Sequence, residues 1–199
     1  MAQIGPITLT GQHVALHPLE PQHHDDLARA VQDGALWQLW YTTIPRPEAM
    51  AAEIDRRLAL LAAGSMLPFT VFERSTGQAV GMTTYMNIDA ATPRLEIGST
   101  WIARRVQRSA LNTEAKLLLL THAFDVLGCL AVEFRTHFQN QQSRRAIERL
   151  GARLDGILRQ HMRLQDGSLR DTCVYSIIAP EWPAVRSGLE WRLAQHNSI

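Results

Sequence analysis

The sequence predicts an α+β fold in which one mixed, mostly antiparallel β-sheet is flanked by helices. Apolar segments over residues 66–73, 78–87 and 95–103 are separated by short turns, which is typical of an antiparallel meander. A helix with apolar residues at helical spacing follows, and it leads to another apolar strand over residues 130–137. Because such a strand–helix–strand crossover favours parallel pairing of its two strands, we expect a mixed sheet.

Capping residues, turn residues and apolar spacing predict the remaining elements. In chain order we expect strands over residues 7–9 and 14–16, helices over 20–31 and 48–63, a helix from 140 to 151, a hairpin of strands over 157–164 and 172–178, and a helix from 180 on. At 199 residues the chain is long enough for one domain with a substantial core, and it is short for two. We therefore expect a single domain over residues 1–199, with its core over 7–178 and a C-terminal helix over 180–195.

Composition and charge argue against several classes of function. A formal net charge of +1 argues against a general nucleic-acid binder. No apolar run reaches membrane-spanning length and no signal-peptide pattern opens the chain, so we expect neither membrane insertion nor export. Cys129 and Cys173 form no Cys-x-x-Cys pair, which favours reduced thiols and a cytoplasmic protein. The run from His23 to Asp26 is not expected to bind a metal, because adjacent helical residues diverge by roughly 100°.

A basic loop joins the strand over residues 95–103 to the following helix. It carries three arginines, Arg104, Arg105 and Arg108. Ser109 or Asn112 can cap that helix, whose N-terminus leaves backbone N–H groups unpaired and carries partial positive charge. Together these features favour binding of a phosphate or a pyrophosphate, and a solvated surface loop is the alternative.

Aromatic residues are concentrated between the first two predicted helices. Trp37, Trp40 and Tyr41 lie close together in a chain that is only 7% aromatic. Trp37 and Trp40 are three residues apart, so a short helix would place them on one face. Core packing is one interpretation, because aromatic side chains bury a large apolar area, and the wall of a substrate pocket is the other.

Two segments of the chain carry a family resemblance when they are taken together. The first covers residues 101–124, and the second covers residues 140–151 in the form Asn-x-x-Ser-x-x-x-x-Glu-x-x-Gly. They resemble the acetyl-coenzyme A (acetyl-CoA) binding core of the GNAT N-acetyltransferase superfamily, in its branch of RimJ/RimL-type acetyltransferases of ribosomal protein N-termini. Residues 166–177 resemble the closing hairpin of that branch, so the resemblance spans residues 7–178. It implies a V-shaped splay beside the central strand.

The resemblance implies acetyl-CoA as co-substrate, with no metal. The pantetheine arm would pair with the backbone of the central strand at Thr100, Trp101 and Ile102, and Asn140 would bind the pantetheine amides. The pyrophosphate would lie on the basic loop and the helix N-terminus, at Arg105, Gln107, Arg108, Ser109, Ala110, Leu111, Asn112 and Thr113.

Arg108 departs from the phosphate-loop pattern of the family. That pattern is Gln/Arg-x-x-Gly-x-Gly/Ala, and Arg108 stands at its first glycine. Glycine there permits unusual torsions and a close approach of the backbone to phosphate. Either the loop keeps its shape with the Arg108 side chain pointing away, or the guanidinium contacts the phosphate directly. A degenerate, non-catalytic relative of the family is the competing interpretation.

The chemistry that the resemblance implies is direct transfer, in which a primary amine attacks the thioester carbonyl and coenzyme A leaves as a thiol. Glu96 is the candidate general base, because these enzymes often keep a carboxylate on this strand. An ion pair with Arg94 is the alternative. Ser143 matches a serine thought to protonate the leaving thiolate, with a helix-terminus contact as the alternative and Tyr175 as a weaker candidate acid.

The sequence leaves the acceptor open between protein N-termini and small-molecule amines. Trp37, Trp40 and Tyr85 are the candidates for lining its pocket. A GNAT-like domain that binds CoA or a nucleotide as a sensor, without turnover, is the alternative function. Exposed sheet edges with Trp182 and Trp191 would suit a homodimer, and packing of both tryptophans on their own domain is the alternative.

Overall fold

A single sheet runs through the computed structural model, which describes residues 4–164 and 166–196. Its strands are β1 (Leu9–Thr10), β2 (Val14–Pro18), β3 (Met66–Glu73), β4 (Ala79–Asp89), β5 (Arg94–Ile102), β6 (Ala131–His137), β7 (Arg153–Arg163) and β8 (Leu169–Ile178). Their order across the sheet is β1-β2-β3-β4-β5-β6-β8-β7. Neighbouring strands are antiparallel except β5 and β6, which are parallel, so the predicted mixed and mostly antiparallel sheet is confirmed.

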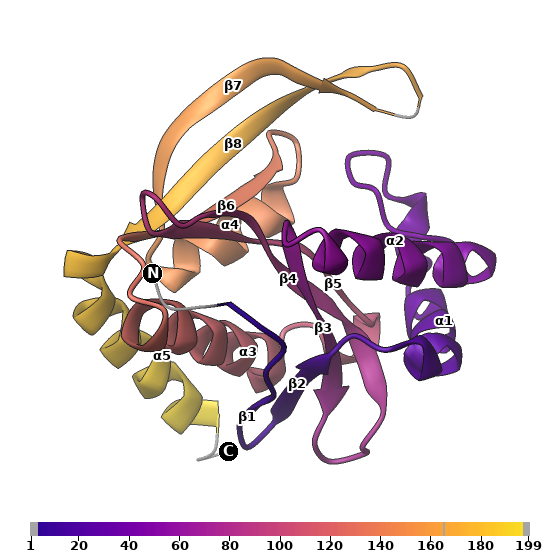
Figure 1. Cartoon of the computed structure of the whole chain (residues 1–199), viewed down its shortest axis with the longest axis horizontal. Helices are drawn as coiled ribbons and strands as arrows, with labels where there is room; N and C mark the ends of the chain where they lie inside the picture. Colours follow the sequence, from indigo (N-terminus) through magenta and orange to yellow (C-terminus); the bar gives the residue numbers. More distant parts are fainter. Residues whose placement is uncertain (1–3, 165, 197–199) are drawn as a thin grey trace.

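Helices pack on both faces of this sheet (Figure 1). The α-helices are α1 (His24–Gln32), α2 (Met50–Ala62), α3 (Ala110–Thr121), α4 (Gln141–Leu150) and α5 (Trp182–His196). Shorter helical turns are η1 (Pro21–His23), η2 (Leu36–Gln38), η3 (Pro47–Ala49), η4 (Arg104–Val106), η5 (His122–Val126) and η6 (Ala179–Glu181). On β4, Thr84 bonds to α2 whereas Tyr85 bonds to α3. Because successive strand residues point to opposite faces, α2 and α3 cover opposite faces of the sheet.

The capping and pairing that the structure shows settle one predicted boundary and correct another. Helix α3 begins at Ala110, so Ser109 is the cap of the two predicted candidates, and its hydroxyl accepts the N–H of Leu111 at 3.3 Å. Strand β7 begins at Arg153 rather than at residue 157, because it pairs with β8 back to Ser176. The resulting β7–β8 hairpin projects beyond the end of β6, which can be followed in Figure 1.

Strands β5 and β6 pair over only three residues and then separate. Residues 94–96 of β5 lie opposite residues 131–133 of β6, and no pairing between the two strands follows. We call the opening between residues 97–102 of β5 and residues 134–137 of β6 the splay. Because the two strands are parallel and pair at their N-terminal ends, the splay opens toward the C-terminal ends of both. The V-shaped splay that the resemblance implied is therefore confirmed.

A β-bulge bends β5 where it leaves β6. Ser99 has φ of 47°, and the register of β4 against β5 shifts around this point. The carbonyl oxygen of Ser99 accepts a hydrogen bond from Arg57 of α2 at 3.1 Å, and the same guanidinium donates to the Thr84 hydroxyl at 2.7 Å. Arg57 is buried and pairs with Glu53 at 2.7 Å. An ion-paired arginine from α2 thus holds the bulge in place.

The β1–β2 turn is held to α3 by a carboxylate. Glu114 accepts the backbone N–H groups of residues 12, 13 and 14 at 2.8, 2.6 and 2.9 Å. A Cβ atom added at Gly11 would lie 2.4 Å from the Glu114 carboxyl carbon. Such a contact forces the carboxylate away from its three donors, each of which is then left without its charge-assisted hydrogen bond.

The Gly11→Ala variant should therefore lose about 1–3 kcal/mol of unfolding free energy, the cost of breaking a partly buried, charge-assisted set of hydrogen bonds. Urea unfolding followed by circular dichroism measures the loss. The matched control is Gly5→Ala, because nothing lies within 4 Å of a Cβ atom added there. Equal unfolding free energies for the two variants would contradict the prediction.

The C-terminal helix packs on its own domain. The Trp182 ring stacks on Phe124 with ring centroids 5.3 Å apart, and its indole N–H donates to Asp125 at 2.9 Å. Own-domain packing is thus confirmed for Trp182, whereas Trp191 is 65% exposed. Within the described residues, none of the helices is both long enough and apolar enough to cross a membrane.

Candidate active site

The basic loop keeps the backbone shape that a glycine would permit at its centre. Arg108 has φ of 63°, in the left-handed region, and its side chain is exposed. Ser109 then caps α3, and its hydroxyl also donates to the carbonyl of Val106 at 2.7 Å. The departure from the family's glycine therefore changes the side chain while the conformation of the loop is retained.

Replacing Arg108 by glycine should raise the unfolding free energy by up to about 1 kcal/mol, because a residue with a Cβ atom is strained in the left-handed region. Arg108→Ala is the control, since it removes the guanidinium and keeps the Cβ atom, and it should show no such gain. Urea unfolding of both variants checks the prediction. A lower unfolding free energy for the glycine variant than for the alanine variant would contradict it. Their CoA affinities, compared with that of the wild type, report separately whether the guanidinium contacts phosphate.

Arg105 and Gln107 are engaged by the protein itself. The guanidinium of Arg105 pairs with Glu73 at 2.6 Å, and its backbone N–H donates to Asp33 at 2.8 Å. The Arg105 guanidinium is therefore held on the β3–β4 hairpin, and its placement gives no support to the predicted phosphate contact. Gln107 donates to the carbonyl of Ile102, at the end of β5, at 3.0 Å.

Two helix N-termini meet at the open end of the splay. Helix α3 follows β5 and helix α4 follows β6. A hydrogen bond of 3.3 Å from Gln142 to Gln107 connects the first turn of α4 to the loop before α3. The first turn of α3 contains Ala110, Leu111, Asn112 and Thr113, whose N–H groups have no partners within the helix. Partial positive charge from both helices therefore gathers where the two strands diverge.

Asn140 and Ser143 stand at the N-terminus of α4. The Asn140 side-chain oxygen accepts the backbone N–H of Ser143 at 3.0 Å, so Asn140 caps the helix as predicted. Ser143 is half-buried, and its hydroxyl forms no hydrogen bond within the part of the chain that the structure describes. The Ser143 hydroxyl is therefore free to donate a proton to a bound group at this end of the splay.

Glu96 lies at the point where the pairing of β5 with β6 ends. Its side chain is buried, accepts a hydrogen bond from Asn87 at 2.7 Å, and lies 3.5 Å from the Arg135 guanidinium. Burial raises the pKa of the Glu96 carboxyl, and the hydrogen bond from Asn87 and the positive charges of Arg135 and Arg170 offset part of that rise. A buried carboxylate with a raised pKa is a better proton acceptor than a solvated one.

Polar residues of β6 extend the site on the same face of the sheet. Glu133 lies opposite Glu96 in the register, and Arg135 and His137 follow at the alternate positions that face the same side. Glu133 pairs with Arg94 and, at 2.9 Å, with Arg135, so the alternative pairing of Arg94 with Glu96 is not observed. Sequence reasoning missed Arg135 and did not select His137, which it interpreted as a structural histidine, although polar residues at every second position of an apolar strand are a readable signal.

The predicted aromatic wall divides into two parts. Trp40, which is 56% exposed, and Tyr41 lie against His137, with ring centroids 5.2 and 6.5 Å from the imidazole. Trp37 is half-buried and packs on the core. Tyr85 is fully buried, and its hydroxyl donates to the carbonyl of Leu119 at 2.6 Å. Tyr85 is thus a core residue behind the sheet, and we do not retain it for an acceptor pocket.

Tyr175 is engaged on the other face of the sheet. Its hydroxyl donates to the Glu148 carboxylate at 2.9 Å and accepts from Arg144 at 3.0 Å, both of which belong to α4. Burial raises the pKa of the Tyr175 phenol. These contacts leave the tyrosine without a free proton for a thiolate, so Ser143 is the better candidate acid.

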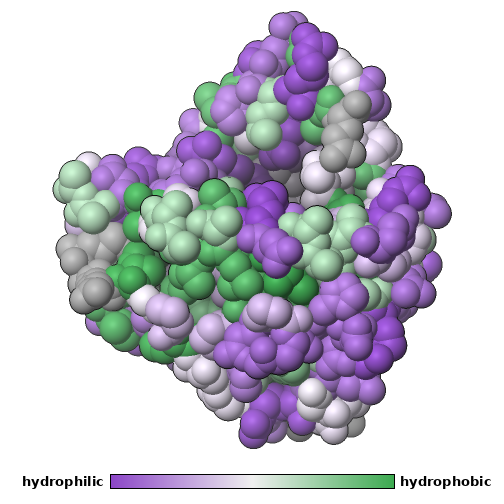
Figure 2. Space-filling model, turned by 45° about the vertical axis from the view of Figure 1, so that its right-hand side comes forward, coloured by the Kyte–Doolittle hydropathy of each residue, from purple (hydrophilic) through white to green (hydrophobic). Residues whose placement is uncertain are grey.

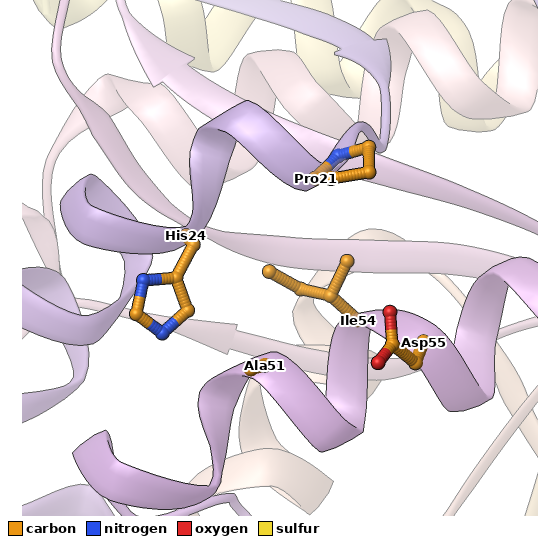
Figure 3. Close-up of a pocket in the computed structure, with 5 residues that line it drawn as sticks. All are labelled: Pro21, His24, Ala51, Ile54 and Asp55. Atoms are coloured by element: carbon orange, nitrogen blue, oxygen red, sulfur yellow. The ribbon is translucent and has the colours of Figure 1, made fainter.

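A pocket between α1 and α2 lies apart from the predicted site residues. Figure 3 shows the side chains that line it, which are Pro21, His24, Ala51, Ile54 and Asp55. None of the predicted cofactor, catalytic or acceptor residues is among them. Among the described residues, no group of three or more His, Cys, Asp or Glu side chains is arranged to hold a metal ion.

The splayed pair of parallel strands and the two helix N-termini at its open end agree with the arrangement that the family resemblance implied. Comparison with known families agrees, because the profile of the Acetyltransferase (GNAT) domain matches residues 13–153. The chain belongs to the GNAT acetyltransferase family, and the resemblance read from its two motifs is confirmed.

Solved structures and curated relatives support this assignment. A GCN5-related N-acetyltransferase from Brucella melitensis superposes with a TM-score of 0.86 at 32% identity, over 96% of this chain and 86% of that chain. Mycobacterium smegmatis RimJ in complex with CoA-disulfide shares the fold, with a TM-score of 0.80 at 22% identity over 94% of this chain and 95% of that chain. Bacillus subtilis (strain 168) YdaF, provisionally named a ribosomal N-acetyltransferase, is 31% identical over 106 residues, which are 53% of this chain and 57% of YdaF. The chain spans less than two thirds of the length of the curated relatives that it matches.

Proposed function

We propose that this protein is an N-acetyltransferase that moves an acetyl group from acetyl-CoA to a primary amine by direct attack. The observation that carries the proposal is Glu96, a buried carboxylate with a raised pKa at the point where β5 leaves β6. A sensor that only binds CoA has no need of a proton acceptor there. We further propose that residues 1–199 act as one domain, supported by the continuous sheet and by the docking of α5 on Phe124.

The residues at the splay fit acetyl-CoA, which when bound would supply an activated thioester. The edge of β5 that faces the splay, at Thr100, Trp101 and Ile102, has no strand partner on the β6 side and offers backbone groups to the pantetheine amides. Asn140 stands across the splay at the start of α4. The first turn of α3 offers its N–H groups and partial positive charge to the pyrophosphate.

In the proposed transfer, Glu96 accepts a proton from the ammonium form of the acceptor. The freed nitrogen lone pair forms a C–N bond to the thioester carbonyl carbon, and the C–S bond breaks. Backbone N–H groups on the open edge of β5 stabilise the negative charge that develops on the carbonyl oxygen. Ser143 donates its hydroxyl proton to the departing sulfur, and the second proton that the nitrogen loses passes through solvent to restore the Ser143 hydroxyl. The products are an acetylated amine and free CoA thiol.

The proposed acceptor is the N-terminal amine of a peptide or protein. Support comes from YdaF, whose name points to ribosomal acetylation, and from the RimJ/RimL-like motifs. Trp40 lies in the segment before α2 and contacts His137, so it supplies apolar surface on the acceptor side, whereas Trp37 packs on the core. A small-molecule amine is the second candidate, and the broad exposure of Trp40 is compatible with either.

Equilibrium binding of acetyl-CoA and a thiol-release assay over a panel of amines test the proposed function together. The panel should contain N-terminal peptides and small amines at matched concentrations. We expect saturable acetyl-CoA binding and amine-dependent release of free thiol. Acetyl-CoA binding without thiol release for any amine would favour the alternative function of a CoA-binding sensor. No binding of acetyl-CoA at all would contradict both functions.

A homodimer stays a prediction, and the edge of the sheet offers it some support. Strand β7 lies at the end of the sheet, and its exposed apolar side chains are Leu154, Ile157, Leu158 and Met162. Size-exclusion chromatography with light scattering tests it. A monomeric mass at every concentration would contradict it.

A further inference from the structure

Arg170 is a half-buried cation without a carboxylate partner. It lies on β8, and its Nε donates to the Thr172 hydroxyl at 3.0 Å. Among the described residues, no carboxylate lies within ion-pair distance of its guanidinium. Arg94 and Arg135, by contrast, both pair with Glu133. Apart from its electrostatic interaction with Glu96, the charge of Arg170 is therefore available to an added anion.

His137 presents a second donor without an acceptor. Its Nδ1 accepts the backbone N–H of Gln139 at 2.9 Å, so the proton of the neutral imidazole is on Nε2. That Nε2 is buried and has no hydrogen-bond partner within the described chain. A buried donor without a partner is unfavourable, and such groups usually serve a ligand or a water. The His137 side chain is only 5% exposed, and Trp40 covers it.

These two donors lie side by side and face Glu96. Thr172, which accepts from Arg170, is the cross-strand partner of His137 in the β6–β8 pair. Arg170 also interacts electrostatically with both His137 and Glu96. Strand β8 continues past the end of β6 into the projecting hairpin, and Figure 2 shows a recess beneath that projection. An acceptor bound on this face of the sheet would meet the carboxylate of Glu96 on β5 and the two donors on β6 and β8.

We propose that Arg170 and His137 form a carboxylate-binding subsite for the acceptor, so that the enzyme prefers amines carrying a carboxylate a few bonds from the nitrogen. This inference rests on the proposed function, because it assigns the acceptor of the same site. The carboxylate has two chemical sources, the α-carboxylate of a free amino acid and an acidic side chain next to the N-terminus of a peptide. Both place a negative charge opposite the guanidinium while the amine reaches Glu96.

The test compares acceptors that differ only in that charge. One pair is the peptide amide Ser-Asp-Ala against Ser-Asn-Ala, and the other is serine against serinamide. The wild type should show kcat/KM about tenfold or more higher for the charged member of the pair that fits, since charge-assisted hydrogen bonds to a partly buried arginine are strong. Which of the two pairs shows the preference identifies the source of the carboxylate.

Variants of Arg170 then assign the preference to the subsite. Arg170→Gln should bring the ratio within the favoured pair close to one, with KM for acetyl-CoA unchanged, and Arg170→Glu should favour Ser-Lys-Ala. His137→Asn should reduce the preference in part. The matched control is Arg159→Gln, because Arg159 lies on β7 and already pairs with Asp171 at 2.6 Å. It should keep the wild-type ratio.

Equal rates within both pairs for the wild type, or an Arg170→Gln variant that keeps the preference, would overturn the inference. If no amine at all releases thiol, the proposed function fails and calorimetry decides the subsite alone. In that case, tighter binding of the charged peptide to the wild type than to Arg170→Gln still supports the subsite. Equal binding to both proteins overturns it.

Discussion

Replacing Glu96 by glutamine should lower kcat/KM for the amine by about 10²-fold or more, the usual contribution of a general base. Glutamine keeps the size of the side chain and can still accept the hydrogen bond from Asn87, but it cannot take a proton from the ammonium. Binding of acetyl-CoA should be unchanged, because Glu96 lies where β5 and β6 stop pairing and not at the helix N-termini that are proposed to bind CoA. Thiol-release kinetics and equilibrium CoA binding measure the two effects separately.

Glu133→Gln is the matched control for this prediction. Glu133 is the cross-strand partner of Glu96 in the pairing of β5 with β6, and Arg94 and Arg135 already neutralise it. Its replacement should leave most of the turnover. Unchanged turnover in the Glu96→Gln variant would remove Glu96 from the mechanism, and equal losses in both variants would indicate a general effect of the charge network.

The pH profile gives a second readout of the same group. Glu96 must be ionised to accept a proton, and burial raises its pKa above 4.5. The value of kcat/KM should therefore fall as the pH falls through that raised pKa. This fall of kcat/KM at low pH should be absent from the residual activity of the Glu96→Gln variant. Its persistence there would assign the titration to another group.

Replacing Lys116 by methionine should stabilise the protein near neutral pH. Lys116 is the only lysine of the chain and is buried on α3, with its ammonium nitrogen 3.2 Å from the Thr100 hydroxyl and 3.4 Å from that of Thr83. Within the described residues it has no carboxylate partner, and burial lowers its pKa from 10.5 to about 7. The folded state therefore holds a neutral amine over a range of pH in which the unfolded chain is protonated.

The sign of the pH dependence follows from proton uptake on unfolding. Between about pH 7 and 10.5 the unfolded chain binds one more proton at Lys116 than the folded protein does, so stability rises with pH across that window. At about 1.4 kcal/mol for each unit of pKa, the rise in the wild type is roughly 4 kcal/mol, and the Lys116→Met variant should lack it. At pH 7 the variant should be more stable by about 2–4 kcal/mol.

Urea unfolding at several pH values checks this prediction for both proteins. Nuclear magnetic resonance of protein labelled with ¹⁵N only at lysine gives the pKa directly, because one side chain contributes the signal. Parallel stability curves for wild type and variant, or a measured pKa near 10.5, would contradict it. Loss of the weak contacts to Thr83 and Thr100 works against the gain but is smaller than a buried charge.

Much of the fold follows from local patterns. The crossover from β5 through α3 to β6 predicted the parallel pair, and the Gly151 helix end and the turn before β8 set the last hairpin. These predictions succeed because apolar spacing, caps and turns act over a few residues. The sequence left the start of α3 open, because Ser109 and Asn112 both suit a cap and only the hydrogen bond decides between them.

The site was predicted in part. Glu96, Asn140 and Ser143 follow from motifs, and the structure brings them to the splay. Tyr85 was misplaced, because an aromatic residue of a strand gives no sign in the sequence of which face will be covered by α3. The subsite of Arg170 and His137 was also out of reach, since it depends on cross-strand register between segments that lie far apart in the chain.

The sequence by itself determined the order of helices and strands, the cap of α4 and the family motifs, because each depends on neighbouring residues. Only the tertiary structure decided which arginines keep a free charge, since a guanidinium is neutralised by whichever carboxylate the fold brings near. Glu73 neutralises Arg105 and Glu133 neutralises Arg135, whereas Arg170 forms no ion pair with a carboxylate among the described residues and bonds to Thr172. Neighbouring residues thus determined the secondary structure, whereas long-range packing determined which charged side chains are neutralised within the protein.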